Sequence, residues 1–281
     1  MNGFTWWQYD FKADKFSELS INEEKSRLEN VLSSLPEGVY TTLRTMNKSH
    51  AFQLANHFQR MMESIQFSGR TFPYSIEELR KPIKHILNTL QGNSHRVRIQ
   101  IPFIGLSICN IVIDELFPYP QEAYDKGVFV KTNHLVRQNP KAKLSDFISN
   151  SQGEKNLLRE NKLEESLIVN KYDSILEGLS SNFFAVKGGK LWTANQDILE
   201  GITRKLLLEE ANLLGIEIIY KAIHYSEIRK IQEAFITSTS RGVMPIVKID
   251  SIEIQNGVPG EMTKKLSDAY YRRFMNEFEE I

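Results

Sequence analysis

Apolar residues recur along the chain in two rhythms that predict different elements. Alternation of apolar and polar residues is typical of strands, and apolar residues three or four positions apart are typical of helices. Helical spacing covers residues 52–65, 79–90, 144–159, 202–214 and 262–279. Strand patterns cover residues 38–45, 96–102, 108–116, 128–132, 166–170, 174–177, 183–187, 190–192, 216–220, 234–237 and 243–249. Strands and helices mix without a regular βαβ rhythm, which favours an α+β fold.

One polar segment divides the chain. Residues 133–142 are polar and contain Pro140, a composition typical of a connector. No internal repeat or low-complexity segment interrupts the sequence on either side. We therefore predict an N-terminal α+β domain over residues 1–132, a linker over residues 133–142 and a C-terminal domain over residues 143–281.

Composition narrows the class of protein. The 281 residues carry Lys+Arg 35 and Asp+Glu 35, so the formal net charge is zero, and neither nucleic acid nor an anionic membrane is an expected partner. The single cysteine, Cys109, excludes an internal disulfide and a cysteine-based zinc site. Residues 1–16 lack the features of a signal peptide, and the apolar run 103–113 is too short to cross a membrane. We expect a soluble cytoplasmic protein without a bound metal.

Three segments in the second half carry candidate chemistry. Residues 199–204 open an apolar helix, where backbone N–H groups without helical acceptors favour an anion. Residues 237–242 combine four hydroxyls, an arginine and a glycine at the end of a buried strand, a set that suits a phosphate or carboxylate. Glu177 ends another strand beside small polar residues, where a half-buried carboxylate needs a cation. Each segment alone also fits ordinary structure: a helix start, a polar loop and a solvated turn.

Two anion sites and a carboxylate that needs a cation together match a phosphorylated heteroaromatic cation. Pyridoxal 5′-phosphate has this form. Its phosphate needs backbone amides and an arginine, its pyridine nitrogen needs an acid, and its aldehyde needs a lysine. The combination suggests this cofactor and directs attention to the lysines.

The order of these segments resembles that of the class IV aminotransferases, the fold-type IV pyridoxal-phosphate enzymes. This family includes branched-chain and D-amino-acid aminotransferases and aminodeoxychorismate lyases. The matching motifs are residues 38–44 (GVYTTLR), 57–64 (HFQRMMES), 177–184 (EGLSSNFF), 199–204 (LEGITR) and 233–240 (EAFITSTS). The resemblance implies a small α+β N-terminal domain, a larger pseudo-barrel C-terminal domain, pyridoxal 5′-phosphate as cofactor and a homodimer.

Two lysines compete for the place of the Schiff-base lysine, which the family has upstream of its glutamate motif. Lys143 lies 34 positions before Glu177, close to the family's separation, and Lys141 lies two residues earlier. We prefer Lys143, because the family has a small residue before its lysine and a polar–aromatic pair after it. Ala142 and Asp146-Phe147 take these places.

The resemblance also implies roles for individual residues. Lys143 is the catalytic lysine, which bonds the cofactor and moves a proton between the substrate Cα and the cofactor. Glu177 pairs with the pyridine nitrogen, and Leu199 packs on the ring. The further cofactor contacts are Arg60, Ile202, Thr203, Thr239 and Ser240 at the phosphate and Asn182 near the ring.

Three departures from the family bear on the substrate. Asp146-Phe147 replaces an Asn-Tyr pair common in branched-chain enzymes, and Pro102-Phe103 replaces an Arg-Gly element of D-amino-acid enzymes. Tyr40-Thr41 replaces a Phe-Glu pair, and a threonine there is a feature of aminodeoxychorismate lyases. The candidate substrate contacts are Tyr40, Arg44, Arg98 and Arg241, of which the arginines suit a carboxylate.

The main hypothesis is a pyridoxal-phosphate-dependent aminotransferase that moves an amino group between an amino acid and a 2-oxo acid, with branched-chain amino acids among the candidates. The first alternative is an enzyme similar to aminodeoxychorismate lyase, which releases pyruvate and 4-aminobenzoate. The second is a non-catalytic binding protein on the same scaffold. Residues 1–36 match the family poorly and are expected at a dimer interface or as a peripheral strand and helix.

Overall fold

The computed structural model describes residues 3–21 and 28–281, so parts of the N-terminal segment 1–36 lie outside the described residues. The chain forms two compact units, each with its own sheet. Unit 1 comprises Met1–Phe117, Lys141–Asn150 and Asn276–Ile281, and unit 2 comprises Pro118–Pro140 and Ser151–Met275.

This grouping of contacts differs from the predicted bounds 1–132, 133–142 and 143–281 in three places, one of which is the C-terminal stretch Asn276–Ile281 that groups with unit 1. The other two places involve tertiary contacts of single segments. β7 (Val128–Asn133) pairs with two strands of unit 2. The segment that carries Lys143 hydrogen-bonds to β3 (Gly38–Met46) of unit 1. Both contacts are tertiary, so the local composition of residues 133–142 does not reveal them.

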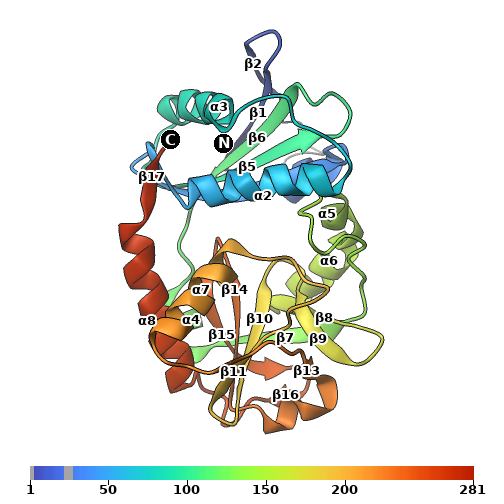
Figure 1. The fold of residues 1–281 in the computed structure, drawn as a ribbon, viewed down its shortest axis with the longest axis vertical. Helices are drawn as coiled ribbons and strands as arrows, with labels where there is room; N and C mark the ends of the chain where they lie inside the picture. Colours follow the sequence, from blue (N-terminus) through green and yellow to red (C-terminus); the bar gives the residue numbers. More distant parts are fainter. Residues whose placement is uncertain (1–2, 22–27) are drawn as a thin grey trace. The chain divides into compact units, whose positions relative to one another are not determined.

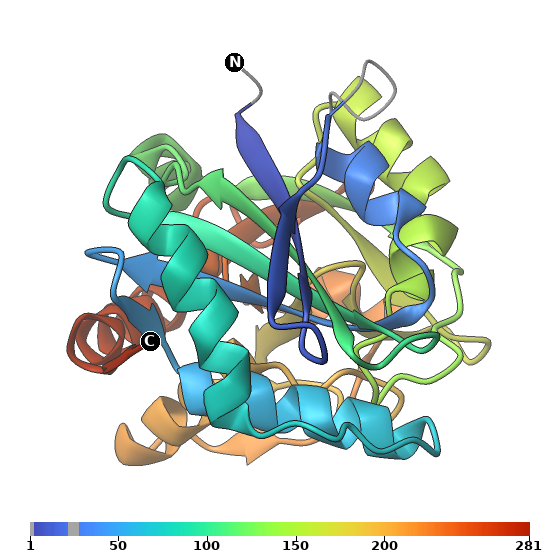
Figure 2. The same cartoon turned by 90° about the horizontal axis from the view of Figure 1, so that it is seen from above.

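Unit 1 contains a seven-stranded sheet in the order β17-β4-β3-β5-β6-β1-β2, in which every pairing is antiparallel (Figures 1 and 2). The further strands are β1 (Phe4–Asp10), β2 (Lys15–Glu18), β4 (His50–Phe52), β5 (His95–Pro102), β6 (Ile108–Glu115) and β17 (Phe278–Glu280). The helices are α1 (Leu28–Ser34), α2 (Leu54–Phe67), α3 (Ile76–Thr89) and α5 (Asp146–Asn150).

One face of this sheet packs against α2 and α3, and α3 passes in front of its strands in Figure 2. The apolar positions that predict both helices are the buried ones, because a stripe at helical spacing must be covered by the sheet. They join alternate residues of β3, β5 and β6 in one core, which includes Leu43, Phe58, Ile83 and Ile99. Cys109 of β6 is fully buried in this core, and burial raises the pKa of its thiol.

The sheet of unit 2 closes on itself. Its central strands are β10 (Asn182–Lys187), β14 (Glu233–Ser238), β15 (Gly242–Ile249), β7, β8 (Glu165–Val169) and β9 (Ser174–Gly178), in that order. β9 then pairs back with β10 through Glu177 and Asn182. Residues from all six strands, among them Val130, Leu167 and Phe183, form one apolar cluster, as the interior of a small barrel requires. The expected α+β fold with a pseudo-barrel is confirmed.

Shorter elements complete unit 2. The additional strands are β11 (Lys190–Trp192), β12 (Ile218–Ile219), β13 (Ile223–His224) and β16 (Ile252–Glu253). The helices are α4 (Gln121–Lys126), α6 (Gln152–Glu160), α7 (Ile202–Leu213), the 3-10 helix η1 (Tyr225–Lys230) and α8 (Glu261–Asn276). The terminal helix predicted over residues 262–279 is too long, because residues 278–280 leave the helix and pair with β4.

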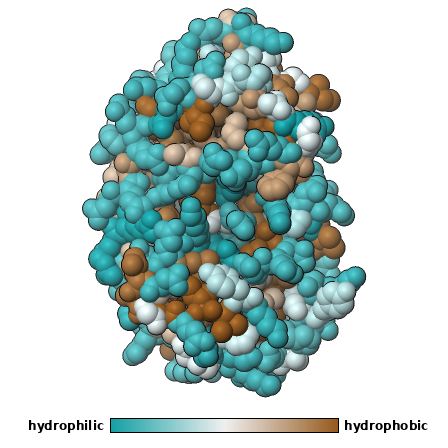
Figure 3. Space-filling model, in the orientation of Figure 1, coloured by the Kyte–Doolittle hydropathy of each residue, from teal (hydrophilic) through white to brown (hydrophobic). Residues whose placement is uncertain are grey.

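The face in Figure 3 is largely hydrophilic, with apolar side chains in several groups. No helix within residues 3–21 and 28–281 combines the length and apolarity that a membrane span requires. The same residues contain no group of three or more His, Cys, Asp or Glu side chains that could hold a metal ion.

Candidate active site

Glu177 and Asn182 form the seam of the barrel, the residue pair that joins β9 to β10. Glu177 is only 2% exposed. Asn182 Nδ2 donates to Glu177 Oε2 at 3.2 Å and to the backbone oxygen of Leu199 at 2.7 Å. The backbone N–H of Leu199 donates to the same glutamate oxygen at 3.0 Å. The seam therefore attaches the segment before α7 to a buried acid.

Arg137 is the cation that the buried Glu177 requires. Arg137 Nε lies 2.9 Å from Glu177 Oε1, and both side chains are shielded from solvent. An adjacent positive charge favours the ionised carboxylate, and burial strengthens this interaction. Arg137 lies in the predicted linker and is not among the sequence-predicted site residues, because only the folded chain brings it to Glu177.

α7 begins directly after the segment that Asn182 and Glu177 bind. A Cβ atom on Gly201 would lie 2.1 Å from Asn182 Oδ1, so only glycine permits this approach. Ile202 and Thr203, both buried, are the first residues of the helix, and no acidic residue lies in its first turn. Their N–H groups have no acceptor within the helix, and the helix dipole favours an anion there.

The predicted hydroxyl-bearing segment forms the tight turn between β14 and β15. Thr237 pairs with Asn182 across β10 and β14. Ser238 and Gly242 pair at the base of the turn, which we call the hydroxyl turn (residues 238–242). Thr239 and Ser240 therefore lie two and three positions beyond the residue that pairs with Asn182. Within unit 2, the three predicted segments converge.

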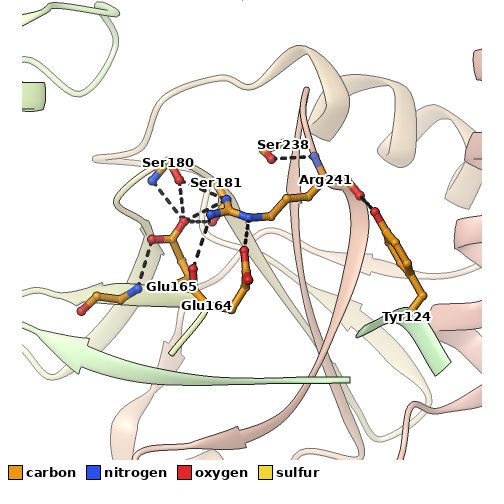
Figure 4. A network of polar contacts seen from close by, with 8 residues as sticks. Tyr124, Glu164, Glu165, Ser180, Ser181, Ser238 and Arg241 are labelled. Atoms are coloured by element: carbon orange, nitrogen blue, oxygen red, sulfur yellow. Dashed lines mark hydrogen bonds and ion pairs between the residues drawn. The ribbon is translucent and has the colours of Figure 1, made fainter. Parts of the chain in front are cut away.

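Arg241 of the hydroxyl turn is bound to two glutamates (Figure 4). Its Nε donates to Glu164 Oε1 at 2.6 Å, and its Nη1 donates to Glu165 Oε2 at 3.2 Å. Burial alone would lower the pKa of the Arg241 guanidinium, but Glu165, Tyr119 and Glu164 raise it above its ordinary value. Glu165 is not among the sequence-predicted site residues, because its burial and its pairing with Arg241 arise only in the folded chain.

Lys143 lies in unit 1 with its backbone fixed on both sides. Its N–H donates to Ser64 Oγ of α2 at 3.0 Å. Its carbonyl oxygen accepts from the N–H of Tyr40 of β3 at 3.0 Å. Its Nζ lies 4.6 Å from the centre of the Tyr40 ring, within the range of a cation–π contact. The competing lysine, Lys141, is exposed.

Arg60 lies in α2, one turn before Ser64. Arg60 Nη2 donates to Thr41 Oγ1 at 3.2 Å, and the same hydroxyl lies 2.8 Å from His57 Nδ1. His57 is fully buried, and this burial, with the charges of Arg60 and Lys143, lowers its pKa well below 6.5. His57 is therefore a neutral imidazole at neutral pH, a role that its motif alone did not indicate.

Arg98 and Arg44 lie on neighbouring strands of unit 1. Arg98 Nη1 lies 2.6 Å from Asp114 Oδ1, and Arg96 pairs with the other oxygen of the same carboxylate. Burial and the nearby Arg96 lower the pKa of Arg98 to about 10, against the opposing effect of Asp114. Arg44 is paired in register with Arg96 across β3 and β5. This face of the sheet is therefore rich in positive charge.

The predicted site residues thus belong to both units. Unit 1 contains Tyr40, Arg44, Arg60, Arg98 and Lys143. Unit 2 contains Glu177, Asn182, Leu199, Ile202, Thr203, Thr239, Ser240 and Arg241. Within unit 2, a buried ion-paired acid, a helix N-terminus and a hydroxyl-bearing turn form a donor set that suits a phosphorylated pyridine. Unit 1, taken by itself, offers a lysine whose backbone is fixed.

A barrel with a buried acid at its seam, beside these unit 2 donors, is compatible with a pyridoxal-phosphate enzyme. Residues 38–249 match the amino-transferase class IV family, and the chain belongs to that family. Its cofactor is accordingly pyridoxal 5′-phosphate.

Two relatives of this chain differ in the substrate for which they are named. D-alanine aminotransferase of Staphylococcus epidermidis is 26% identical over 266 residues, which cover 89% of this chain and 93% of the relative. Branched-chain-amino-acid aminotransferase of Pseudomonas aeruginosa is 24% identical over 254 residues, which cover 83% of each protein.

Solved structures agree on the fold. A putative branched-chain amino acid aminotransferase from Thermotoga maritima has a TM-score of 0.78 and 24% identity, with 98% of this chain and 97% of that chain covered. The branched-chain amino acid aminotransferase of Escherichia coli has a TM-score of 0.76 and 21% identity, with 99% of this chain and 96% of that chain covered. A further branched-chain amino acid aminotransferase, solved with pyridoxamine 5′-phosphate, has a TM-score of 0.80 and 21% identity, with 98% of this chain and 97% of that chain covered.

Proposed function

We propose that the protein transfers amino groups from neutral aliphatic amino acids to a 2-oxo acid, with Lys143 as its catalytic lysine. Two relatives, named for D-alanine and for branched-chain amino acids, support this substrate class, because both names describe uncharged aliphatic side chains. Membership of the class IV family supports the reaction.

The observation that carries the proposal is the environment of Glu177. The carboxylate is buried, paired with Arg137 and bound to Asn182. A buried acid in this state suits a protonated pyridine nitrogen, whose positive charge it stabilises. When bound, pyridoxal 5′-phosphate supplies a ring that accepts the electron pair released at the substrate Cα.

Lys143 is assigned the proton transfer. Its main chain is held by Ser64 and Tyr40, so the flexible part of the residue is the side chain that carries Nζ. With pyridoxal 5′-phosphate bound, the side-chain amine of Lys143 would hold the cofactor's aldehyde carbon and, as a free amine, would take the proton from the substrate Cα. Its place above the Tyr40 ring limits the directions in which Nζ moves.

The remaining cofactor contacts are proposals of the same kind. Ile202 and Thr203 offer helix N–H groups to the phosphate, and a side chain as large as that of Leu199 can cover the face of the ring. Thr239 and Ser240 offer hydroxyls, Arg60 offers a guanidinium, and Asn182 orients the acid.

The substrate carboxylate is assigned to the positively charged face of unit 1. Arg44 and Arg98 are the proposed carboxylate contacts, and Tyr40 is proposed to line the substrate position beside Lys143. Arg241 is not assigned to the substrate carboxylate, because Glu164 and Glu165 bind its guanidinium.

We further propose a homodimer in the cytoplasm. The family resemblance supports the dimer, and a sole cysteine kept as a buried thiol is compatible with a reducing compartment. Sedimentation of the holoenzyme tests the dimer: a single monomer-sized species across the working concentration range would exclude it.

The deciding experiment maps the lysine. The holoenzyme is reduced with borohydride, which fixes the cofactor to its lysine, and the digested protein is analysed by mass spectrometry. We expect the cofactor on Lys143, loss of turnover in Lys143→Ala and full turnover in the matched control Lys141→Ala. Cofactor on Lys141, or turnover retained without Lys143, would overturn the assignment.

The substrate class is tested by adding single amino acids to the holoenzyme without an oxo acid. We expect alanine or a branched-chain amino acid, in one hand, to convert the bound cofactor to pyridoxamine 5′-phosphate. Conversion only by acidic or basic amino acids would contradict the class. Release of pyruvate and 4-aminobenzoate from aminodeoxychorismate, with no transamination, would indicate the lyase.

A further inference from the structure

Glu165 is a buried carboxylate that the proposed chemistry does not use. It begins β8 and is 1% exposed. Its Oε2 accepts the Ser180 N–H at 3.3 Å, the Ser180 hydroxyl at 2.8 Å and the Ser181 hydroxyl at 3.0 Å. These serines form the turn that connects Glu177 to Asn182, so Glu165 fixes the turn that ends in the seam.

Gly178 shows how closely this carboxylate approaches the turn. A Cβ atom on Gly178 would lie 2.8 Å from Glu165 Cγ and 2.9 Å from Cδ. Any side chain at the residue after Glu177 would thus displace Glu165. The arrangement costs free energy unless the carboxylate is paired, because burial removes its hydration.

Arg241 is the partner that Glu165 shares with the second turn. Arg241 Nη1 also donates to Ser180 Oγ at 3.0 Å, so the guanidinium contacts both the acid and its turn. The main chain of Arg241 is fixed as well. Its N–H donates to Ser238 Oγ at 3.3 Å, and its carbonyl oxygen accepts the Tyr124 hydroxyl at 2.7 Å (Figure 4). One residue thereby fixes the hydroxyl turn to the seam turn.

We propose that Glu165 and Arg241 form a positioning pair that sets the hydroxyl turn, with Thr239 and Ser240, at the distance from Glu177 that one cofactor molecule spans. The inference rests on the proposed cofactor contacts. Glu177 keeps its ion pair with Arg137 and its hydrogen bond from Asn182 when Glu165 or Arg241 is changed, so we expect the ring end to be disturbed less than the phosphate end. The phosphate end depends on the hydroxyl turn and is the end that the pair controls.

Two cofactor forms distinguish positioning from general stability. Absorbance titration of the apoprotein gives its affinity for pyridoxal 5′-phosphate and for pyridoxal, which lacks the phosphate. In Glu165→Gln and in Arg241→Lys we expect the affinity for pyridoxal 5′-phosphate to fall about tenfold or more, since small displacements of binding groups have effects of this size. The affinity for pyridoxal should change little. The double variant should bind pyridoxal 5′-phosphate about as well as the single variant that binds it less tightly, because the two residues act on the turn through their shared contact.

Glu227→Gln is the matched control, since it removes another ion-paired carboxylate of unit 2, the partner of Lys187 at 2.6 Å. We expect it to leave both affinities unchanged. If Glu165→Gln does not fold, Ser180→Ala and Ser181→Ala each remove one hydrogen bond of Glu165. Each should lower the ratio of the affinity for pyridoxal 5′-phosphate to the affinity for pyridoxal, to a smaller extent.

A parallel fall of both affinities in the Glu165 and Arg241 variants, or an unchanged ratio in all of them, would overturn the inference while the proposed function stands. Failure of the unmodified protein to bind pyridoxal 5′-phosphate would instead remove the proposed function, and the inference with it.

Discussion

Asn182 and Glu177 face each other across the seam of the barrel, and the Asn182 amide also binds the backbone of Leu199. One side chain therefore joins a buried acid to the segment that opens α7. The acid and the helix N-terminus are the groups proposed for the two ends of the cofactor. Their relative position is thus fixed by an amide rather than by a loop.

Gly201→Ala should disturb this amide. The added Cβ would lie 2.1 Å from Asn182 Oδ1, so either Asn182 or the start of α7 must move. We expect the affinity for pyridoxal 5′-phosphate to fall about tenfold, and the free energy of unfolding of the apoprotein to fall by about 1–3 kcal/mol. Titration and urea unfolding measure the two effects.

Gly153→Ala is the matched control for this change. Gly153 lies in α6 with nothing within 4 Å of the position of its Cβ. Because alanine is the better helix former, this variant should be neutral or more stable by up to about 1 kcal/mol. Equal cofactor affinities of the two variants would contradict the role given to Gly201.

Arg137→Met should destabilise unit 2. The change removes the Arg137 guanidinium from the buried Glu177 carboxylate, and breaking a buried ion pair costs about 3 kcal/mol or more. The double variant Arg137→Met, Glu177→Met should recover part of the loss, because both charges of this pair are then removed. Urea unfolding of the apoproteins tests both statements. A double variant less stable than the single one would show that the charge is not the cause.

The buried His57 predicts a pH dependence of stability. Its pKa is well below 6.5 in the folded chain and returns to about 6.5 on unfolding. Below that pH the unfolded state binds a proton that the folded state does not. Stability present above pH 6.5 is therefore lost as pH falls toward the folded-state pKa, at up to about 1.4 kcal/mol per pH unit.

Urea unfolding of the wild type and His57→Gln across this pH range measures the contribution. The variant lacks the titrating group and should show a shallower decline. His85→Gln, which changes an exposed histidine of α3, should decline like the wild type. Identical slopes for wild type and His57→Gln would exclude His57 as the source.

Removal of residues 277–281 should loosen one edge of the unit 1 sheet. β17 covers the edge of β4, and Ile281 is buried in the core of the same unit. We expect faster hydrogen exchange in β3 and β4 and a lower stability of unit 1, with the exchange of β8, β14 and β15 unchanged. Uniform acceleration in both units would show that the truncation acts on the whole fold instead.

The sequence predicted the elements that are strongly periodic. α2 and α7 each present apolar residues at helical spacing to a core, so local pattern and final burial agree. β17 was missed because residues 278–280 continue a helical pattern, and only pairing with β4 makes them a strand. The short strands β4, β13 and β16 lack a pattern of their own for the same reason.

Some residues of the candidate site could be predicted from the sequence and others could not. Motif order selected Glu177, Asn182 and the start of α7, and in the structure these residues are hydrogen-bonded to one another. Arg137 and Glu165 were not selected, because each acquires its role from a partner far along the chain. A charge in a polar segment is common on protein surfaces, and nothing in its immediate neighbours distinguishes the one that is buried.

The position of Cys109 has a practical consequence. The sole thiol of the chain lies in the core of unit 1, covered by α2 and α3 and kept protonated by its surroundings. An alkylating reagent can modify it only while that core is open, so the rate of labelling reports how often unit 1 opens. Unit 2 contains no cysteine, so the labelled position always lies in unit 1. The rate of Cys109 alkylation is therefore a measure of the opening of unit 1 that needs no introduced label.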